Sequence, residues 1–162
     1  MAQNRSNDPL GVFNFYLTLI DSSNIVGTLI SAVINYAVAG FSECSGLEVT
    51  MEVMEYKEGG VNDYVRKFPT RASHTNITLK RGVVVLADEL WTWHQSFVQG
   101  SGKRRDGLIV VMDESRSPAK VWKFKSGIPL KWVGPSLNAT QSGVAIESLE
   151  ISHEGLLYEV GA

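Results

Sequence analysis

Apolar and polar residues alternate with a period of two along much of the chain, and this pattern constrains the fold more than any other feature. Near the N-terminus one face of a predicted strand carries Phe13, Phe15, Leu17 and Leu19, because successive side chains of a strand point to opposite sides. Alternation recurs in residues 47–56, 76–80, 122–132 and 144–160. The unbroken apolar run at 108–112 is typical of a strand buried on both faces. The pattern predicts a chain built mainly of strands.

Three of these segments depart from simple alternation. In residues 47–56 the apolar positions are odd up to Val53 and even from Met54, which predicts a bulge or strong bend at that point. In residues 144–151 a similar change falls near Glu147 and Ser148. In residues 122–132 the apolar side chains lie at even positions, and Gly127 and Pro129 interrupt the pattern. We expect a pair of two-faced strands there, with Leu130 turned inward.

A single helix is predicted at about 88–99. Asp88 can cap its start, and Gly100 can end it. One side of this helix carries Leu90, His94, Phe97 and Val98. Trp91 and Trp93 lie about 200° apart on a helix and cannot face the same core, so either one contacts a partner or the two are buried against different layers. One short helix in a strand-rich chain predicts a β-barrel or a β-sandwich with a helical plug, in a single domain spanning 1–162.

Composition narrows the classes of partner. The protein has a net charge of −2, whereas a dedicated nucleic-acid binder is strongly basic. The single cysteine excludes an intramolecular disulfide and a Cys-rich zinc site, which favours folding in a reducing compartment. The first ten residues do not form a signal peptide. The uncharged stretch 22–42 contains Gly, Ser, Thr and Asn and has no flanking Lys or Arg, so we expect no stable membrane insertion.

No motif in the sequence supports a catalytic, cofactor or metal site. Residues 100–103 (GSGK) lack the rest of a phosphate loop, and residues 40–44 (GFSEC) lack the closing glycine of a nucleophile elbow. The three histidines are far apart in sequence, and Cys44 has acidic neighbours that raise the pKa of a thiol. We therefore predict a protein that is not an enzyme. A basic strand face, exposed to solvent or to a lumen, is predicted from Lys123, Lys125 and Lys131.

An ordered series of short motifs resembles the tail-tube proteins of contractile-tailed phages and of extracellular contractile injection systems, which are related to the inner-tube protein of type VI secretion. The series consists of residues 39–49 (AGFSECSGLEV), 55–60 (EYKEGG), 66–69 (RKFP), 75–82 (TNITLKRG) and 88–91 (DELW). The resemblance implies a mainly β fold, a β-barrel-like sandwich of antiparallel strands with one α-helix. It also implies a subunit that forms hexameric rings, which stack into a hollow inner tube driven through a target envelope by sheath contraction. It also implies sheath and baseplate or spike proteins as partners, and protein cargo or DNA in the lumen.

The resemblance further implies assembly in the cytoplasm of the producer cell, in a phage tail or in a particle that is released. By resemblance, a projecting arm at about 57–71 and the connection before it contact other subunits. The predicted interface residues are Phe41, Ser42, Glu43, Glu58, Gly59, Gly60, Tyr64, Arg66, Lys67, Phe68 and Arg71. The first hairpin, at about 21–40, is longer and more apolar than in typical members. This departure leaves open whether the chain is the bulk tube subunit or a tube-initiating ring at the baseplate. A secreted effector-carrying ring of the type VI secretion kind is a separate alternative.

Overall fold

The computed structural model describes residues 10–11, 14–21, 40–60, 63–84, 88–140 and 142–160. In this part of the chain nine strands and one helix follow one another, which confirms the mainly β architecture predicted from the alternation. The elements are β1 (Phe15–Asp21), β2 (Glu43–Ser45), β3 (Val49–Tyr56), β4 (Arg66–His74), β5 (Ile77–Gly82), α2 (Glu89–Val98), β6 (Arg105–Met112), β7 (Pro118–Val133), β8 (Ile146–Ser152) and β9 (Gly155–Val160).

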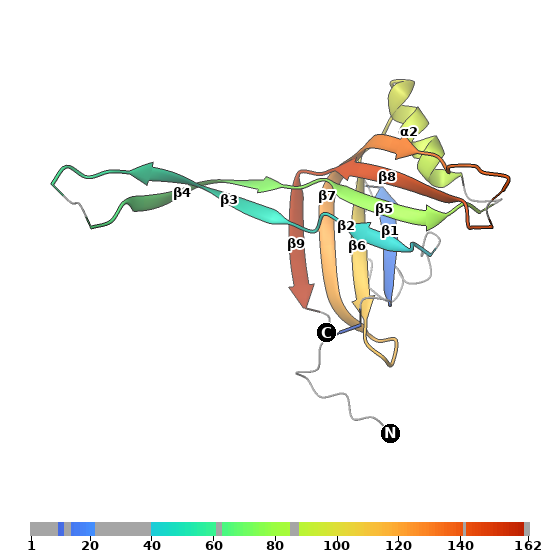
Figure 1. Ribbon diagram of the computed structural model, residues 1–162, viewed down its shortest axis with the longest axis horizontal. Helices are drawn as coiled ribbons and strands as arrows, with labels where there is room; N and C mark the ends of the chain where they lie inside the picture. The colour runs from blue at the N-terminus through green and yellow to red at the C-terminus, as the bar shows by residue number, and fades with distance from the viewer. Residues whose placement is uncertain are drawn as a thin grey trace.

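The strands form two crossing layers and one separate hairpin (Figure 1). One layer contains β1, β6, β9 and the first part of β7, and the other contains β2, β5, β8 and the last part of β7. The 16-residue strand β7 therefore belongs to both layers. A strand that changes sheets at a bend is characteristic of near-orthogonal sheet packing. β3 pairs only with β4 and stands apart from this body.

β7 replaces the predicted pair of strands. The register with β6 shifts beside Ser126, whose φ of 54° is left-handed, and the register with β8 shifts between Pro129 and Lys131. These two irregularities bend one continuous strand instead of ending it, so Gly127 and Pro129 lie within β7. Leu130 falls at the second irregularity and is exposed, which makes its predicted inward position wrong.

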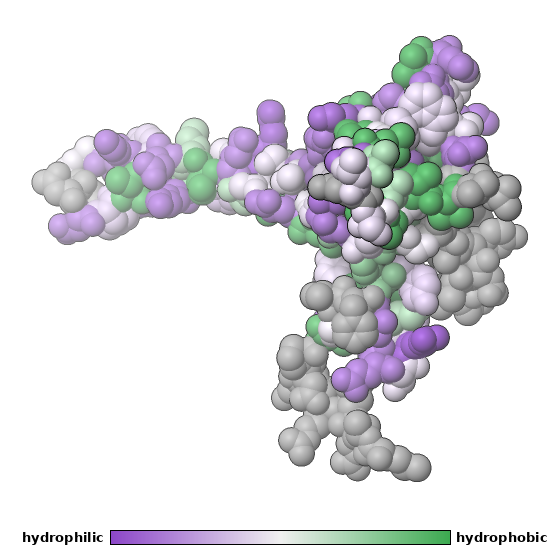
Figure 2. Space-filling model, turned by 45° about the vertical axis from the view of Figure 1, so that its right-hand side comes forward, coloured by the Kyte–Doolittle hydropathy of each residue, from purple (hydrophilic) through white to green (hydrophobic). Residues whose placement is uncertain are grey.

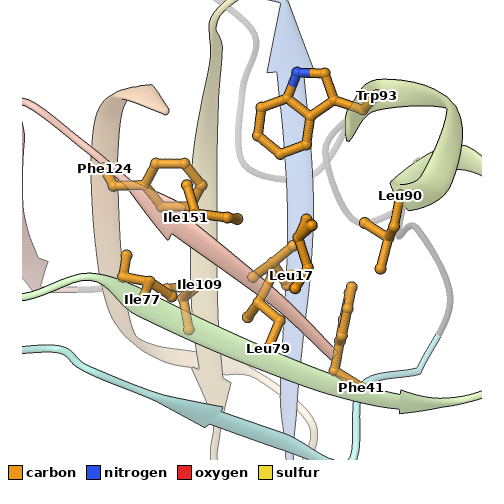
Figure 3. Close-up of a cluster of buried hydrophobic side chains, with 10 residues drawn as sticks. Leu17, Phe41, Ile77, Leu79, Leu90, Trp93, Ile109, Phe124 and Ile151 are labelled. Carbon is orange, nitrogen blue, oxygen red and sulfur yellow. The ribbon is translucent and has the colours of Figure 1, made fainter. Parts of the chain in front are cut away.

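The core lies between the two layers and beneath the helix (Figure 3). The inward positions of β5 that alternation predicted, Ile77 and Leu79, are fully buried, and so are Leu17 of β1 and Phe124 of β7. Burying a side chain of this size stabilises the fold by about 1.5–3 kcal/mol. The cluster consists of Leu17, Phe41, Ile77, Leu79, Leu90, Trp93, Ile109, Phe124, Leu149 and Ile151.

The helix contributes Leu90 and Trp93 to the core, and the Trp93 indole N–H donates to the Lys103 carbonyl at 2.9 Å. Trp91 is 42% exposed and meets Trp132 edge-on, with 4.6 Å between ring centroids. Two details of the predicted helix are wrong. Asp88 makes no side-chain capping hydrogen bond, and Val98 is 68% exposed because the buried side of the helix is centred on Trp93.

The change of alternation predicted in residues 144–151 does not occur, because an acidic residue of a buried ion pair occupies an inward position. β8 alternates regularly, with Glu147, Leu149 and Ile151 turned inward. The Glu147 carboxylate accepts from Arg81 Nε at 2.5 Å and from the Trp132 indole N–H at 3.0 Å. Because these donors satisfy a buried charge, an acidic residue occupies an inward position, and Ile146 is exposed. The predicted change at Glu147 and Ser148 is therefore wrong.

Most of the predicted first hairpin, at about 21–40, lies outside the described residues, as do Phe13 and the segment 1–9. Within the described part of the chain, none of the helical structure is long and apolar enough to cross a membrane.

Candidate assembly interface

The hairpin formed by β3 and β4 projects from the body, and we call residues 49–74 the arm (Figure 1). Every residue of β3 is exposed, and in β4 every residue is exposed except His74. Eight residues of extended strand span roughly 25 Å, so the outer half of the arm lies far from the body. The segment predicted at 57–71 forms the tip and most of β4, and β3 belongs to the arm as well.

The arm carries apolar side chains without a core beneath them, interspersed with charged ones (Figure 2). An isolated two-stranded hairpin is marginally stable in water. A group of exposed apolar side chains on a projecting element is typical of a protein–protein contact. The large apolar residues of the arm that are more than one-third exposed are Val49, Met51, Val53, Met54, Tyr56, Tyr64, Val65 and Phe68.

The strand register assigns the outer residues of the arm to two faces. Residues directly opposite each other in an antiparallel pair share a face. Met54 lies opposite Phe68, and Tyr56 lies opposite Arg66. We call these four residues the distal face. The other side of the outer arm is more polar, because Glu55 lies opposite Lys67 there. The register shifts between Met51 and Val53, slightly before the bulge predicted at Val53 and Met54.

Two of the basic residues predicted at the arm, Arg66 and Lys67, form ion pairs with glutamates of the arm. Arg66 Nε lies 2.8 Å from a Glu58 carboxylate oxygen, and Lys67 Nζ lies 3.8 Å from Glu55. Such exposed pairs contribute only about 0–1 kcal/mol. The remaining predicted positions of the arm, Gly59, Gly60, Tyr64 and Arg71, are all exposed. These exposed ion pairs therefore add little to the stability of the arm.

The root of the arm is held to the body by contacts that the sequence did not indicate. The His74 and His153 rings lie 5.4 Å apart, although the two residues are far apart in the sequence, and His153 Nε2 lies 3.1 Å from the Thr75 carbonyl oxygen. Burial lowers the pKa of His153, and the neighbouring His74 acts in the same direction. Gly46, with a φ of 88°, makes the turn into the arm where a Cβ would lie 2.0 Å from the Asn76 carbonyl oxygen.

The three predicted interface residues before the arm differ in exposure. Phe41 is buried in the core and presents no surface to a partner. Ser42 is exposed, and its backbone N–H and hydroxyl both donate to the Lys80 carbonyl, at 2.8 and 3.1 Å. The Glu43 carboxylate is exposed and accepts from Lys80 Nζ at 2.9 Å. Only Ser42 and Glu43 therefore remain available on the surface.

An apolar pocket of about 450 Å³ opens beside these two residues, between β2 and the layer of β1, β6 and β7. Cys44 is in its wall, and burial together with Glu43 raises the pKa of this thiol to about 11. Because only the thiolate is a strong nucleophile, Cys44 is suited to a structural role. The pocket residues used below are Phe15, Cys44, Leu47, Ile109, Val111 and Trp122.

The three predicted lysines do not share one strand face. Lys123 and Lys125 lie in the part of β7 that pairs with β9, whereas Lys131 lies opposite Glu150 of β8 in the other layer. Lys125 and Lys131 are exposed, and Lys123 is half-buried. The sequence did not indicate this separation, because the prediction assumed that the alternation continues unchanged through both irregularities of β7.

The described residues bring together no group of three or more His, Cys, Asp or Glu side chains that could hold a metal ion. The exposed arm and the apolar pocket both have the apolar character that suits protein–protein contact.

Comparison with known proteins agrees with this geometry. The family model of T4-like virus tail tube protein gp19 matches residues 12–157, and the chain belongs to this family. Its members are structural proteins of a tube. A comparison by sequence with proteins of curated function gives no match.

Solved structures of injection particles contain chains with the same fold. One such chain comes from the sheath–tube complex, in the extended state, of the extracellular contractile injection system PVC. It superposes with a TM-score of 0.79 at 22% sequence identity, covering 96% of this chain and 94% of that one. A chain from the tube-terminating cap of the anti-feeding prophage superposes with a TM-score of 0.80 at 20% sequence identity, covering 99% of this chain and 97% of that one. A chain from the baseplate of the anti-feeding prophage superposes with a TM-score of 0.74 at 21% sequence identity, covering 94% of this chain and 97% of that one.

Proposed function

We propose that this chain is the inner-tube subunit of a contractile injection particle, and that six copies form a ring that stacks on identical rings. The observation that carries the proposal is the arm, whose apolar side chains stand in water without cover from the rest of the described chain. Membership of the tail tube family and the likeness to a chain of a sheath–tube complex support a tube as the product.

The partners follow from the same proposal. The similar chains come from a sheath–tube complex, a tube cap and a baseplate, so we infer contacts with a sheath, with a baseplate and with further copies of this chain. The tube would contain protein cargo or DNA and would assemble in the cytoplasm of the producing cell. No catalytic step is part of this function, since the work is mechanical.

In the ring, one surface of a subunit meets a different surface of its neighbour, which closes the assembly without leftover edges. We assign ring-to-ring contact to the arm residues Tyr64 and Phe68 and to their exposed neighbours Glu58, Gly59, Gly60, Arg66, Lys67 and Arg71. Ser42 and Glu43 belong to the same junction. Lys123, Lys125 and Lys131 face either the lumen or the outside of the tube.

Electron microscopy of the purified protein in negative stain tests the proposal. We expect rings with six-fold symmetry and stacks of such rings. The double variant Tyr64→Ala/Phe68→Ala should remain folded but fail to stack, because apolar anchors carry most of the energy of an interface. Long tubes formed by the double variant would contradict the assignment of the arm, and a wild-type protein that stays monomeric would contradict self-assembly.

A further inference from the structure

We propose that the distal face of the arm docks into the apolar pocket of a second copy of this chain. This inference rests on the proposed tube function and adds the receiving surface on the second copy. The inserted residues are Met54, Tyr56 and Phe68. The pocket walls are Phe15, Cys44, Leu47, Ile109, Val111 and Trp122.

The positions of the two surfaces in one subunit require the contact to be between copies. Leu47 lines the pocket and lies two residues before β3, so the pocket opens at the root of the arm. Met54 lies seven residues beyond Leu47, which corresponds to roughly 20 Å of strand. A paired, extended hairpin cannot turn back over that distance. The distal face therefore reaches a neighbouring subunit, while its own pocket is open to another arm.

The two surfaces match in chemistry. The pocket is mainly apolar and has a volume of about 450 Å³, and the distal face presents an aromatic ring, a phenol and a thioether. Side chains of this kind are enriched at the centres of protein interfaces. Docking would also bring Arg66 of the distal face, which pairs with Glu58 of its own arm, near Glu43 at the pocket rim, which pairs with Lys80. Opposite charges at a rim orient two partners.

The arrangement also accounts for the difference between the two sides of the outer arm, of which the distal face carries the larger apolar side chains. Met54 and Phe68 face one way, whereas Glu55 and Lys67 face the other way and pair with each other. A subunit with an insert on one surface and a receptor on another forms a head-to-tail contact, which builds rings or helical stacks. The same contact repeated at every subunit would fix the spacing between neighbours.

Site-directed cross-linking tests the docking. In a Cys44→Ala background, one variant carries Ser42→Cys at the pocket rim and Arg66→Cys on the distal face. The matched control carries Ser42→Cys and Lys67→Cys, because Lys67 is adjacent in sequence, also pairs with a glutamate, and points to the opposite face. Assembled protein is treated with a short bismaleimide and resolved on a denaturing gel. We expect a ladder of covalent oligomers with Arg66→Cys and mainly monomer with Lys67→Cys.

A second pair of variants tests the anchor without cross-linking. Phe68→Ser should weaken assembly at least about tenfold, because it removes a central aromatic side chain, whereas Lys67→Ser should change assembly little. Thermal melting of the isolated subunits checks that both variants fold. Assembly is measured by analytical ultracentrifugation over a range of concentrations.

The outcomes separate this inference from the proposed function. Rings or tubes that cross-link equally through positions 66 and 67, or through neither, would overturn the docking and leave the tube function standing. A protein that stays monomeric and uncross-linked at every concentration would overturn both. Strong cross-linking through position 66 together with loss of assembly in Phe68→Ser would establish the pocket as the receptor for the arm.

Discussion

Phe124 and Phe68 both lie on antiparallel strands of the same chain, yet Phe124 is 0% exposed in the body and Phe68 is 45% exposed on the arm. In the body, two crossing layers and a helix cover one another's apolar faces. In the arm, two strands cover nothing but each other. The body is therefore stable through its own contacts, whereas the apolar residues of the arm gain their free energy only when another chain covers them.

The largest expected difference between the two regions comes from the same substitution made in each. Phe124→Ala should lower the free energy of unfolding of the isolated subunit by about 3–5 kcal/mol, because it leaves a cavity in a packed core. Phe68→Ala should change it by no more than about 0.5 kcal/mol, as for most surface substitutions. Urea denaturation followed by tryptophan fluorescence measures both. A similar loss in the two variants would show that the arm packs against its own body in solution.

A smaller effect is expected from two glycines with nearly the same backbone conformation. Gly46 at the root of the arm has a φ of 88°, and Gly60 at its tip has a φ of 89°. Gly60→Ala should cost about 1 kcal/mol for the left-handed conformation alone. Gly46→Ala should cost more, because its Cβ would lie 2.0 Å from the Asn76 carbonyl oxygen.

Thermal melting of the two glycine variants compares these costs. Equal stabilities would mean that the turn at Gly46 relaxes freely, and that the junction between body and arm is not rigid.

The smallest expected effect on the fold concerns the thiol of Cys44. Burial raises its pKa to about 11 from an ordinary value of 9.0, so at pH 8 the thiolate fraction is about a hundred-fold below that of an unfolded thiol. The folded state holds this proton more tightly, so the contribution of Cys44 to stability is complete below pH 9 and declines as the pH rises towards 11.

Alkylation with iodoacetamide at pH 8 measures this reactivity. Native wild-type protein should react about a hundred-fold more slowly than the denatured protein. The matched control is Cys44→Ala/Arg66→Cys, whose single thiol lies on the arm and should react nearly as fast folded as unfolded. Rapid alkylation of native Cys44 would show that the pocket admits solvent more freely than its lining indicates.

Several elements could be predicted from the sequence because local physics decides them. Period-two alternation identified the inward residues of β1 and β5, and the apolar run 108–112 identified β6. The helix and a fold of the barrel or sandwich class followed from the same patterns, and the antiparallel sandwich followed from the family resemblance. The ordered series of short motifs predicted the tail tube family, and the family match over residues 12–157 confirms it.

Other features depended on contacts between residues far apart in the chain. Glu147 turns inward because Arg81, 66 positions away, supplies its counter-charge. His74 meets His153 because the root of the arm lies against the turn between β8 and β9. The apolar residues of β3 resembled a core strand in sequence, although the charges between them, Glu52 and Glu55, were a signal that neither face is buried.

By itself, the sequence determined the strand content, the inward residues of the regular strands, the single helix and the family. Only the tertiary structure decided which apolar faces are covered, where β7 passes from one layer to the other, and that β3 and β4 leave the body as an arm. The physical reason is that alternation records which side chains share a face, whereas burial depends on what lies against that face, and distant parts of the chain or other chains supply it.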